Sequence, residues 1–141
     1  MKMQGNWIGF YEYGEGYSLP HFGERVKFRF SLEDTENGFE GKCIEDDSEI
    51  SIKEISEVSG FIEDGMISFV NTYSNRYEID EENIQPRNKI IEGKEYSVNY
   101  SGLYDERFDC FYGVWEIDYK DSELTDFFTG GIWKMKKDIT S

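Results

Sequence analysis

Hydrophobic and polar residues alternate with a period of two along much of the chain. The clearest run is Arg25–Leu32, whose apolar members are Val26, Phe28, Phe30 and Leu32. This alternation places apolar side chains on one face and charged ones on the other, as in a β-strand with one buried face. The Asn-Gly pair at 37–38 predicts a hairpin turn after it. Arg25–Leu32 is therefore predicted to be one strand of a hairpin, with one face buried and the other exposed to solvent.

Similar runs recur at spacings near ten residues. The predicted strands are Gly5–Tyr13, Arg25–Leu32, Phe39–Ile44, Ile50–Ile55 or Val58–Ile62, Met66–Tyr73, Tyr96–Tyr100, Phe108–Tyr119 and Phe127–Lys136. About eight short strands at this spacing are typical of a meander that closes into a barrel or a sandwich. We expect an all-β fold, a single antiparallel up-and-down β-barrel over residues 1–141.

Two intervals interrupt this rhythm. Ser74–Lys94 contains Pro86 and few aliphatic residues, and it predicts one long loop, with a short strand or a helical turn around Glu81–Gln85 as the local alternatives. Loops of this length often act as lids or binding loops, although an ordinary surface excursion is the other interpretation. Tyr13–Glu24 is a second long connection.

A Gly-x-Trp phrase occurs three times. It stands at Gly5-x-Trp7, Gly113-x-Trp115 and Gly131-x-Trp133. Because glycine in a strand lets a large neighbour pack over the backbone, we expect the indoles to fill barrel space beside glycine notches.

The opening Gly5-x-Trp7, the number of short strands and the closing strand Gly131-Ile132-Trp133-Lys134-Met135 resemble the calycin superfamily: lipocalins, fatty-acid-binding proteins and avidin-like proteins. Two features depart from it. The last strand lacks the arginine of lipocalins, and Gly14–Gly23 is too short for the helical pair of fatty-acid-binding proteins. The resemblance implies a barrel with an internal ligand site, without supplying a ligand.

Our leading functional hypothesis is a non-catalytic binding protein that holds a small apolar or aromatic ligand. The residues expected to line its barrel are Trp7, Tyr11, Phe28, Phe30, Tyr96, Tyr100, Trp115 and Trp133.

Composition supports the all-β interpretation. The 141 residues include no alanine and only four leucines, so a helical bundle is close to excluded. Aromatic residues make up 17% of the chain, which is more than one barrel interior needs.

Several strands are apolar on both faces. In Gly5–Tyr13, Ile8 and Phe10 oppose Trp7 and Tyr11. A barrel wall in water should be apolar on one face only. We therefore expect the long loop, a second sheet or another subunit to cover the outer face. This predicts a homo-oligomer or a partner interface at the first strand and Phe108–Tyr119.

The net charge of −15 opposes binding to nucleic acid and to anionic membranes. Residues Glu33–Asp64 carry twelve acids and two lysines, a net charge of −10. Solubility is one explanation. The alternative is an inhibitor or immunity-type protein that docks a basic protein partner. Its predicted partner-binding residues are Glu45, Asp46, Asp47 and Glu49. We expect the opposing basic stripe, which starts at Arg25, to pair across strands with acids such as Glu40.

The sequence predicts no enzyme, no cofactor and no metal site. His21 is the only histidine and lies in a Pro-His-Phe-Gly turn, so we expect a surface or turn residue. Cys43 and Cys110 lie in predicted strands, and no Cys-x-x-Cys occurs. We expect both to be buried free thiols, with a disulfide as the alternative. Without a signal-peptide core at the start, a cytoplasmic location is expected.

Overall fold

A computed structural model describes residues 2–17, 19, 21–46, 51–80, 87–91, 96–118 and 130–139, with the backbone alone for 76–80, 87–91, 96 and 118. Ten strands form in this part of the chain. They are β1 (Gly5–Tyr13), β2 (Arg25–Thr35), β3 (Gly38–Glu45), β4 (Ser56–Glu63), β5 (Met66–Tyr73), β6 (Arg76–Asp80), β7 (Arg87–Ile91), β8 (Tyr96–Asp105), β9 (Cys110–Asp118) and β10 (Gly130–Lys137). No helix in this part is long and apolar enough to cross a membrane.

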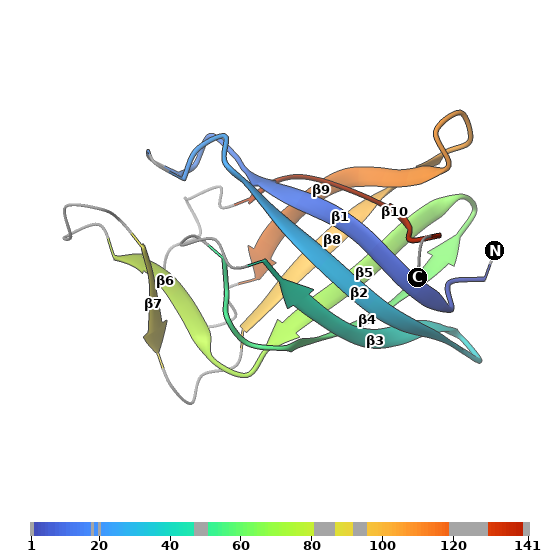
Figure 1. Ribbon diagram of the computed structural model, residues 1–141, viewed down its shortest axis with the longest axis horizontal. Helices are drawn as coiled ribbons and strands as arrows, with labels where there is room; N and C mark the ends of the chain where they lie inside the picture. Colours follow the sequence, from blue (N-terminus) through green and yellow to red (C-terminus); the bar gives the residue numbers. More distant parts are fainter. Residues whose placement is uncertain are drawn as a thin grey trace.

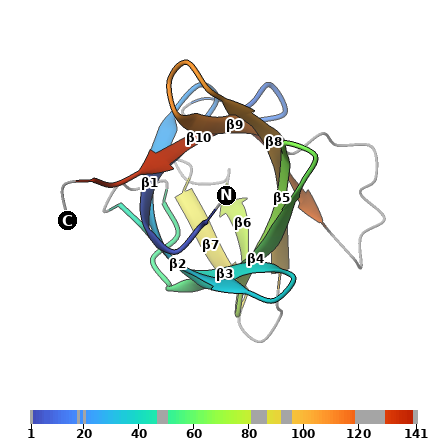
Figure 2. The same cartoon turned by 90° about the vertical axis from the view of Figure 1, so that its right-hand side faces the viewer.

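Eight of the strands close into one antiparallel barrel (Figures 1 and 2). Their order is β1-β10-β9-β8-β5-β4-β3-β2, so each strand pairs with its neighbours and β1 pairs with both β2 and β10. This is the single all-β, up-and-down barrel that the alternation predicts.

The barrel has two different ends. At one end, which we call the turn end, short hairpins join β2 to β3, β4 to β5 and β8 to β9, and both termini leave the barrel there (Figure 1). At the other, the loop end, β1, β3, β5 and β9 end and β2, β4, β8 and β10 begin. The ends differ in the length of the chain segments that join their strands, which are short at the turn end and longer at the loop end.

Local chemistry explains the tightest turn. Asp64 and Gly65 have φ values of 53° and 78°, and they join β4 to β5. Positive φ at both central residues is the type I′ arrangement, whose twist matches that of the flanking strands and which favours Asp-Gly. The Asp64-Gly65 pair thus closes the β4–β5 hairpin. The predicted Asn-Gly turn is shifted by one residue, since Gly38 already pairs with Thr35.

The interval 74–94 differs from the prediction of one long loop. β6 and β7 pair there as a separate two-stranded ladder outside the barrel. Glu81–Gln85 lies outside the described residues. Of the two alternatives for the fourth strand, Val58–Ile62 is the one confirmed, because β4 begins at Ser56 and Ile50–Ile55 belongs to the connection before it.

The glycine notches are confirmed by the strand register. Gly131 on β10 pairs with Trp115 on β9, and Gly113 on β9 pairs with Trp133 on β10. A Cβ added at Gly131 would lie 2.9 Å from the Trp115 indole nitrogen, and one at Gly102 on β8 would lie 2.9 Å from the Trp133 ring. The indoles of Trp115 and Trp133 therefore occupy space that neighbouring glycines leave open, whereas Trp7 pairs with Lys137 and Phe30 and with no glycine.

Candidate functional site

The residues expected to line a ligand site face the barrel interior. Trp7, Tyr11, Phe28, Phe30, Tyr100, Trp115 and Trp133 are all buried there. The Tyr96 side chain lies outside the described part of the structure. The structure brings the seven together, but it also shows them packed on one another.

Aromatic rings fill the middle of the barrel. The Phe69 ring stacks on Tyr100 with 4.6 Å between centroids and meets the edges of Trp133 at 5.2 Å and Phe30 at 5.5 Å. Phe28 stacks on Phe30 at 4.4 Å. Offset and edge-to-face pairs at these separations are the preferred aromatic arrangements. This part of the interior is a packed core.

The three indole N–H groups are already bonded to backbone carbonyls. Trp7 Nε1 donates to Met3 O at 2.8 Å, Trp115 Nε1 to Glu12 O at 3.1 Å, and Trp133 Nε1 to Ser101 O and Val114 O at 3.1 and 3.0 Å. Buried indoles usually find such a partner. Both the rings and the N–H groups of the indoles are therefore already engaged in contacts within the barrel.

Polar groups meet inside the loop end of the barrel. Glu45 is 9% exposed and points inward from the end of β3. Its Oε1 accepts hydrogen bonds from the Tyr11 hydroxyl and, at 3.0 Å, from the Ile52 N–H. Its Oε2 accepts from the Tyr73 hydroxyl at 2.5 Å, and Asn71 Nδ2 donates to that hydroxyl at 3.0 Å. We call these side chains, together with Cys43 and Ser56, the Glu45 cluster.

Burial perturbs the ionisable groups of the cluster. It raises the pKa of the Glu45 carboxyl, although the hydrogen bonds from Ile52, Tyr11 and Tyr73 act in the opposite direction. Burial, followed by the nearby Glu45 charge, raises the pKa of Tyr11 and of the Cys43 thiol. Desolvation disfavours the charged form of each group. The loop end is therefore a low-dielectric environment that contains hydrogen-bonding groups.

Two polar atoms of this cluster lack hydrogen-bond partners in the described part of the chain. Ser56 Oγ and Asn71 Oδ1 are buried with no bonded donor or acceptor, and both residues lie beside the Cys43 thiol. A buried polar atom without a partner costs about 1–3 kcal/mol. Such atoms in a native interior point to a bound water or a ligand group.

Aromatic side chains stand over the cluster. Tyr13 meets Tyr11 edge-on at 5.6 Å, Tyr17 at 4.8 Å and His21 at 5.1 Å. Tyr17 also lies 6.1 Å from the Trp115 ring. His21 is in a turn, as expected, but it is buried and not on the surface, because the β1–β2 connection packs it against Tyr13.

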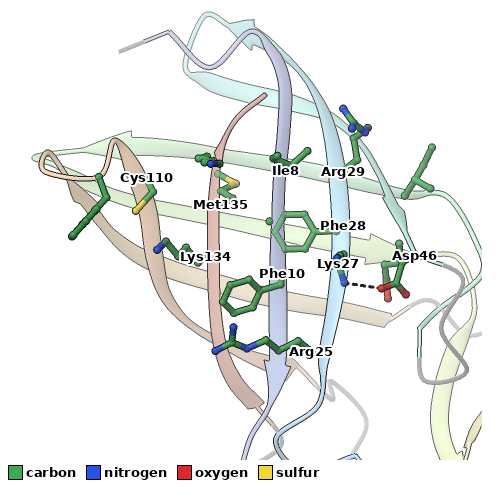
Figure 3. A pocket seen from close by; sticks show the side chains of 15 residues that line it. Ile8, Phe10, Arg25, Lys27, Phe28, Arg29, Asp46, Cys110, Lys134 and Met135 are labelled. Carbon is green, nitrogen blue, oxygen red and sulfur yellow. Dashed lines mark hydrogen bonds between the residues drawn. The ribbon is translucent and has the colours of Figure 1, made fainter. Parts of the chain in front are cut away.

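A groove of about 900 Å³ runs over the outside of β2, β1 and β10 (Figure 3). Ile8 and Phe10 of β1 lie along its centre, and Ile44 and Phe108 are also among the residues that line it. The apolar outer face predicted for the first strand is confirmed. Phe108 and Val114 are 66% and 55% exposed, so the described part of the chain does not cover this face.

Two arginines of the groove are held by acids across strands. Arg25 Nε lies 3.1 Å from Glu12 Oε1, and the Arg25 guanidinium covers the Phe10 ring at 4.2 Å. Arg29 Nη1 lies 2.6 Å from Asp138 Oδ2. The basic stripe does pair across strands, but with Glu12 and Asp138 and not with Glu40, which lies opposite Glu33.

The residues named for an acidic partner surface separate in the structure. Glu45 belongs to the interior cluster, so its carboxylate does not face solvent. Asp46 is half-buried, and its Oδ2 accepts from the Lys27 N–H at 3.0 Å. Asp47 and Glu49 lie outside the described residues. The alternation along β3 could have placed Glu45 in the interior. Glu45 is in phase with Phe39 and Cys43, which are both buried.

Both cysteines are buried free thiols, which confirms the prediction for Cys43 and Cys110 and excludes the disulfide. The described residues contain no group of three or more His, Cys, Asp or Glu side chains suited to hold a metal ion. No protein-family model matches this chain, and neither a curated protein nor a solved structure is significantly similar to it.

Proposed function

We propose that this chain is a calycin-like, non-catalytic binding protein that takes a small ligand into the loop end of its barrel. The observation that carries the proposal is the pair of orphaned atoms, Ser56 Oγ and Asn71 Oδ1, beside the buried Glu45 carboxyl. A ligand that bonds to them would remove the desolvation cost that they now impose.

The chemistry of the cluster defines the ligand class. Asn71 Oδ1 is only an acceptor, so the ligand must present an N–H or O–H donor to it. The rings of Tyr11, Tyr13 and Trp115 stand at the same end of the barrel and favour an apolar or aromatic body. The expected ligand is therefore a small, largely apolar compound with one hydrogen-bonding group. The packed rings around Phe69 exclude a long ligand that spans the barrel.

1-Aminoanthracene tests this proposal, because it combines an aromatic body with one amine donor and its fluorescence rises in apolar sites. We expect saturable binding at one site. Asn71→Leu should weaken it about tenfold, since a buried hydrogen bond contributes about 1 kcal/mol or more. Ile67→Val on the same strand, at the turn end, is the matched control and should bind as the wild type does.

Two results would count against an internal site. One is the absence of saturable binding to the folded wild type. The other is equal affinity in the wild type and Asn71→Leu, with the variant more stable, which would make the orphaned oxygen a simple packing defect. Far-ultraviolet circular dichroism of each variant checks that the barrel is intact.

A second candidate function is the acidic interaction surface. Glu33 on β2 and Glu40 on β3 are exposed and lie directly opposite each other in the register. Like charges in that position are destabilising, and a basic partner would relieve the repulsion. With cytochrome c as a basic probe, Glu33→Lys/Glu40→Lys should weaken salt-sensitive co-elution. The variant Glu106→Lys, in the β8–β9 turn, should not weaken it. A loss in Glu106→Lys of about half that in the double variant, in proportion to the change in charge, would indicate net charge alone.

A further inference from the structure

The outer groove gathers positive charge in a strongly acidic chain. Five of the fifteen basic residues line it, while the chain as a whole has a net charge of −15. These residues are Arg25, Lys27, Arg29, Lys134 and Lys136. Among the described residues that line the groove, the carboxylates are Asp46 and Glu45, and Glu45 points inward. The groove is thus opposite in sign to the rest of the molecule.

The strand register places cations on both sides of each central apolar residue. Phe10 lies between Lys27 on β2 and Lys134 on β10. In Figure 3 the three side chains come from the adjacent strands β2, β1 and β10, and Phe10 belongs to the middle strand. Lys27 and Lys134 are exposed, whereas Phe10 is half-buried. The order across the three strands is therefore cation, aromatic ring, cation.

A similar order, with an aliphatic side chain between the two cations, occurs two residues earlier on β1. Ile8 lies between Arg29 on β2 and Lys136 on β10. Strand neighbours are about 4.8 Å apart, so the cations on β2 (Lys27 and Arg29) and those on β10 (Lys134 and Lys136) stand about 10 Å from each other. That separation matches the diameter of an α-helix, about 10–12 Å with its side chains.

Within the described part of the chain, three of the five cations have no acidic partner. Arg25 and Arg29 are held by Glu12 and Asp138. Among the described residues, no carboxylate lies within 4.0 Å of the ammonium groups of Lys27, Lys134 or Lys136. Lys134 Nζ instead stands 5.8 Å from the Phe108 ring centroid. These charges are available to an incoming anion.

We propose that this groove docks an acidic, amphipathic helical segment of a partner protein. Apolar side chains of the segment would pack on Ile8 and Phe10. Carboxylates on its two flanks would pair with the cations of β2 and of β10. Contacts on both flanks fit a segment with many carboxylates better than an amphiphile with one anionic head. The charge complementarity favours fast, salt-sensitive association.

A second copy of this chain is a poorer occupant. A two-fold contact would place the three unpartnered lysines against their own copies, and isologous interfaces must be self-complementary. A head-to-tail contact with the acidic β3–β4 face would generate rings or open filaments. An anionic membrane surface is disfavoured by the net charge of the chain.

Fluorescence anisotropy tests the groove with a labelled peptide of about 18 residues, five helical turns. The probe carries leucines in one stripe and glutamates on both sides of it. A peptide of the same composition in permuted order is the control ligand. We expect the striped peptide to bind the wild type more tightly, and binding should weaken as NaCl rises above about 0.15 M.

Matched variants locate the binding site. Lys27→Gln/Lys134→Gln should weaken the striped peptide about fivefold to tenfold, because two exposed ion pairs are lost. Lys2→Gln/Lys42→Gln removes the same charge from exposed lysines outside the groove and should have little effect. Phe10→Ala should also weaken binding, whereas the exposed Phe61→Ala on β4 should not.

Three outcomes would overturn the proposal. One is equal binding of the striped and permuted peptides, or an equal loss of affinity for the striped peptide in Lys27→Gln/Lys134→Gln and Lys2→Gln/Lys42→Gln. The second is a wild-type dimer in sedimentation equilibrium that Lys27→Gln/Lys134→Gln dissociates, which would assign the groove to self-association. The third is lysine-dependent binding to vesicles of anionic phospholipid without binding of the peptide. All substituted positions are exposed except the half-buried Phe10, and circular dichroism checks the fold of every variant.

Discussion

Phe69→Ala measures how tightly the middle of the barrel is packed. Phe69 is 1% exposed and lies between Tyr100 at 4.6 Å, Trp133 at 5.2 Å, Phe30 at 5.5 Å and Phe39 at 6.2 Å. Removing its ring leaves a cavity bounded by four other rings, which strand pairing prevents from moving far. The proposed ligand site occupies only the loop end because this region is full.

The expected cost is large for a chain of this size. Phenylalanine-to-alanine changes in packed cores cost about 3–5 kcal/mol, the sum of the lost transfer free energy and the cavity. Against a total stability of about 5–15 kcal/mol, such a variant remains folded but marginal. Its melting temperature should fall by roughly 10–15 °C.

Urea unfolding, followed by both circular dichroism and tryptophan fluorescence, provides the assay. Coincident transitions and an unchanged m-value would allow the midpoints to be compared as free energies. Phe61→Ala on the neighbouring strand is the control, since Phe61 is 46% exposed on the outer face and should cost under about 1 kcal/mol. A loss below about 1.5 kcal/mol for Phe69→Ala would refute a packed interior.

Four further predictions concern individual residues. Because burial raises the pKa of Glu45, the folded state binds its proton more tightly than the unfolded state, and the stability of the wild type relative to Glu45→Gln should fall as pH rises above 4.5. Lys42 lowers the pKa of Glu57, so the stability relative to Glu57→Gln should instead fall as pH drops below 4.5; urea midpoints from about pH 4 to about pH 8 check both signs. Gly113→Ala should cost about 1–3 kcal/mol or more in the same assay, as its Cβ would lie 1.9 Å from a carbonyl oxygen of β8, and a neutral effect would contradict this geometry. Cys43 and Cys110 should react with a thiol reagent only slowly in the native protein and rapidly in urea, whereas fast native labelling would show that the strands open.

Strand parity is the part of the fold that the sequence predicted best. Met66–Tyr73 matches β5 at both ends, since alternation begins directly after a turn that Asp64 and Gly65 define locally. Buried faces of Arg25–Leu32 and Gly5–Tyr13 were also predicted correctly. An alternation with a period of two shows which face of a strand is buried, and it can be read from the residues of that strand alone.

The candidate site was much less predictable. Glu45 stood in a run of acids and was assigned to the surface by its neighbours, although its phase on β3 placed it inside. Its donors come from β1, β5 and the connection before β4, and no local pattern brings Tyr11, Ile52 and Tyr73 together. β6 and β7 were missed because each has only five residues and the interval around them contains few aliphatic residues.

The seam between β1 and β10 has a consequence for synthesis of the chain. The first strand must wait for a partner whose residues lie more than a hundred positions later, as in the pairing of Trp7 with Lys137. Until that last strand leaves the ribosome, β1 and β9 each present an unpaired edge, and such edges invite association with other chains. Loop closure over this distance is slow for non-local β pairing. Newly made copies should therefore depend on chaperones until the seam forms.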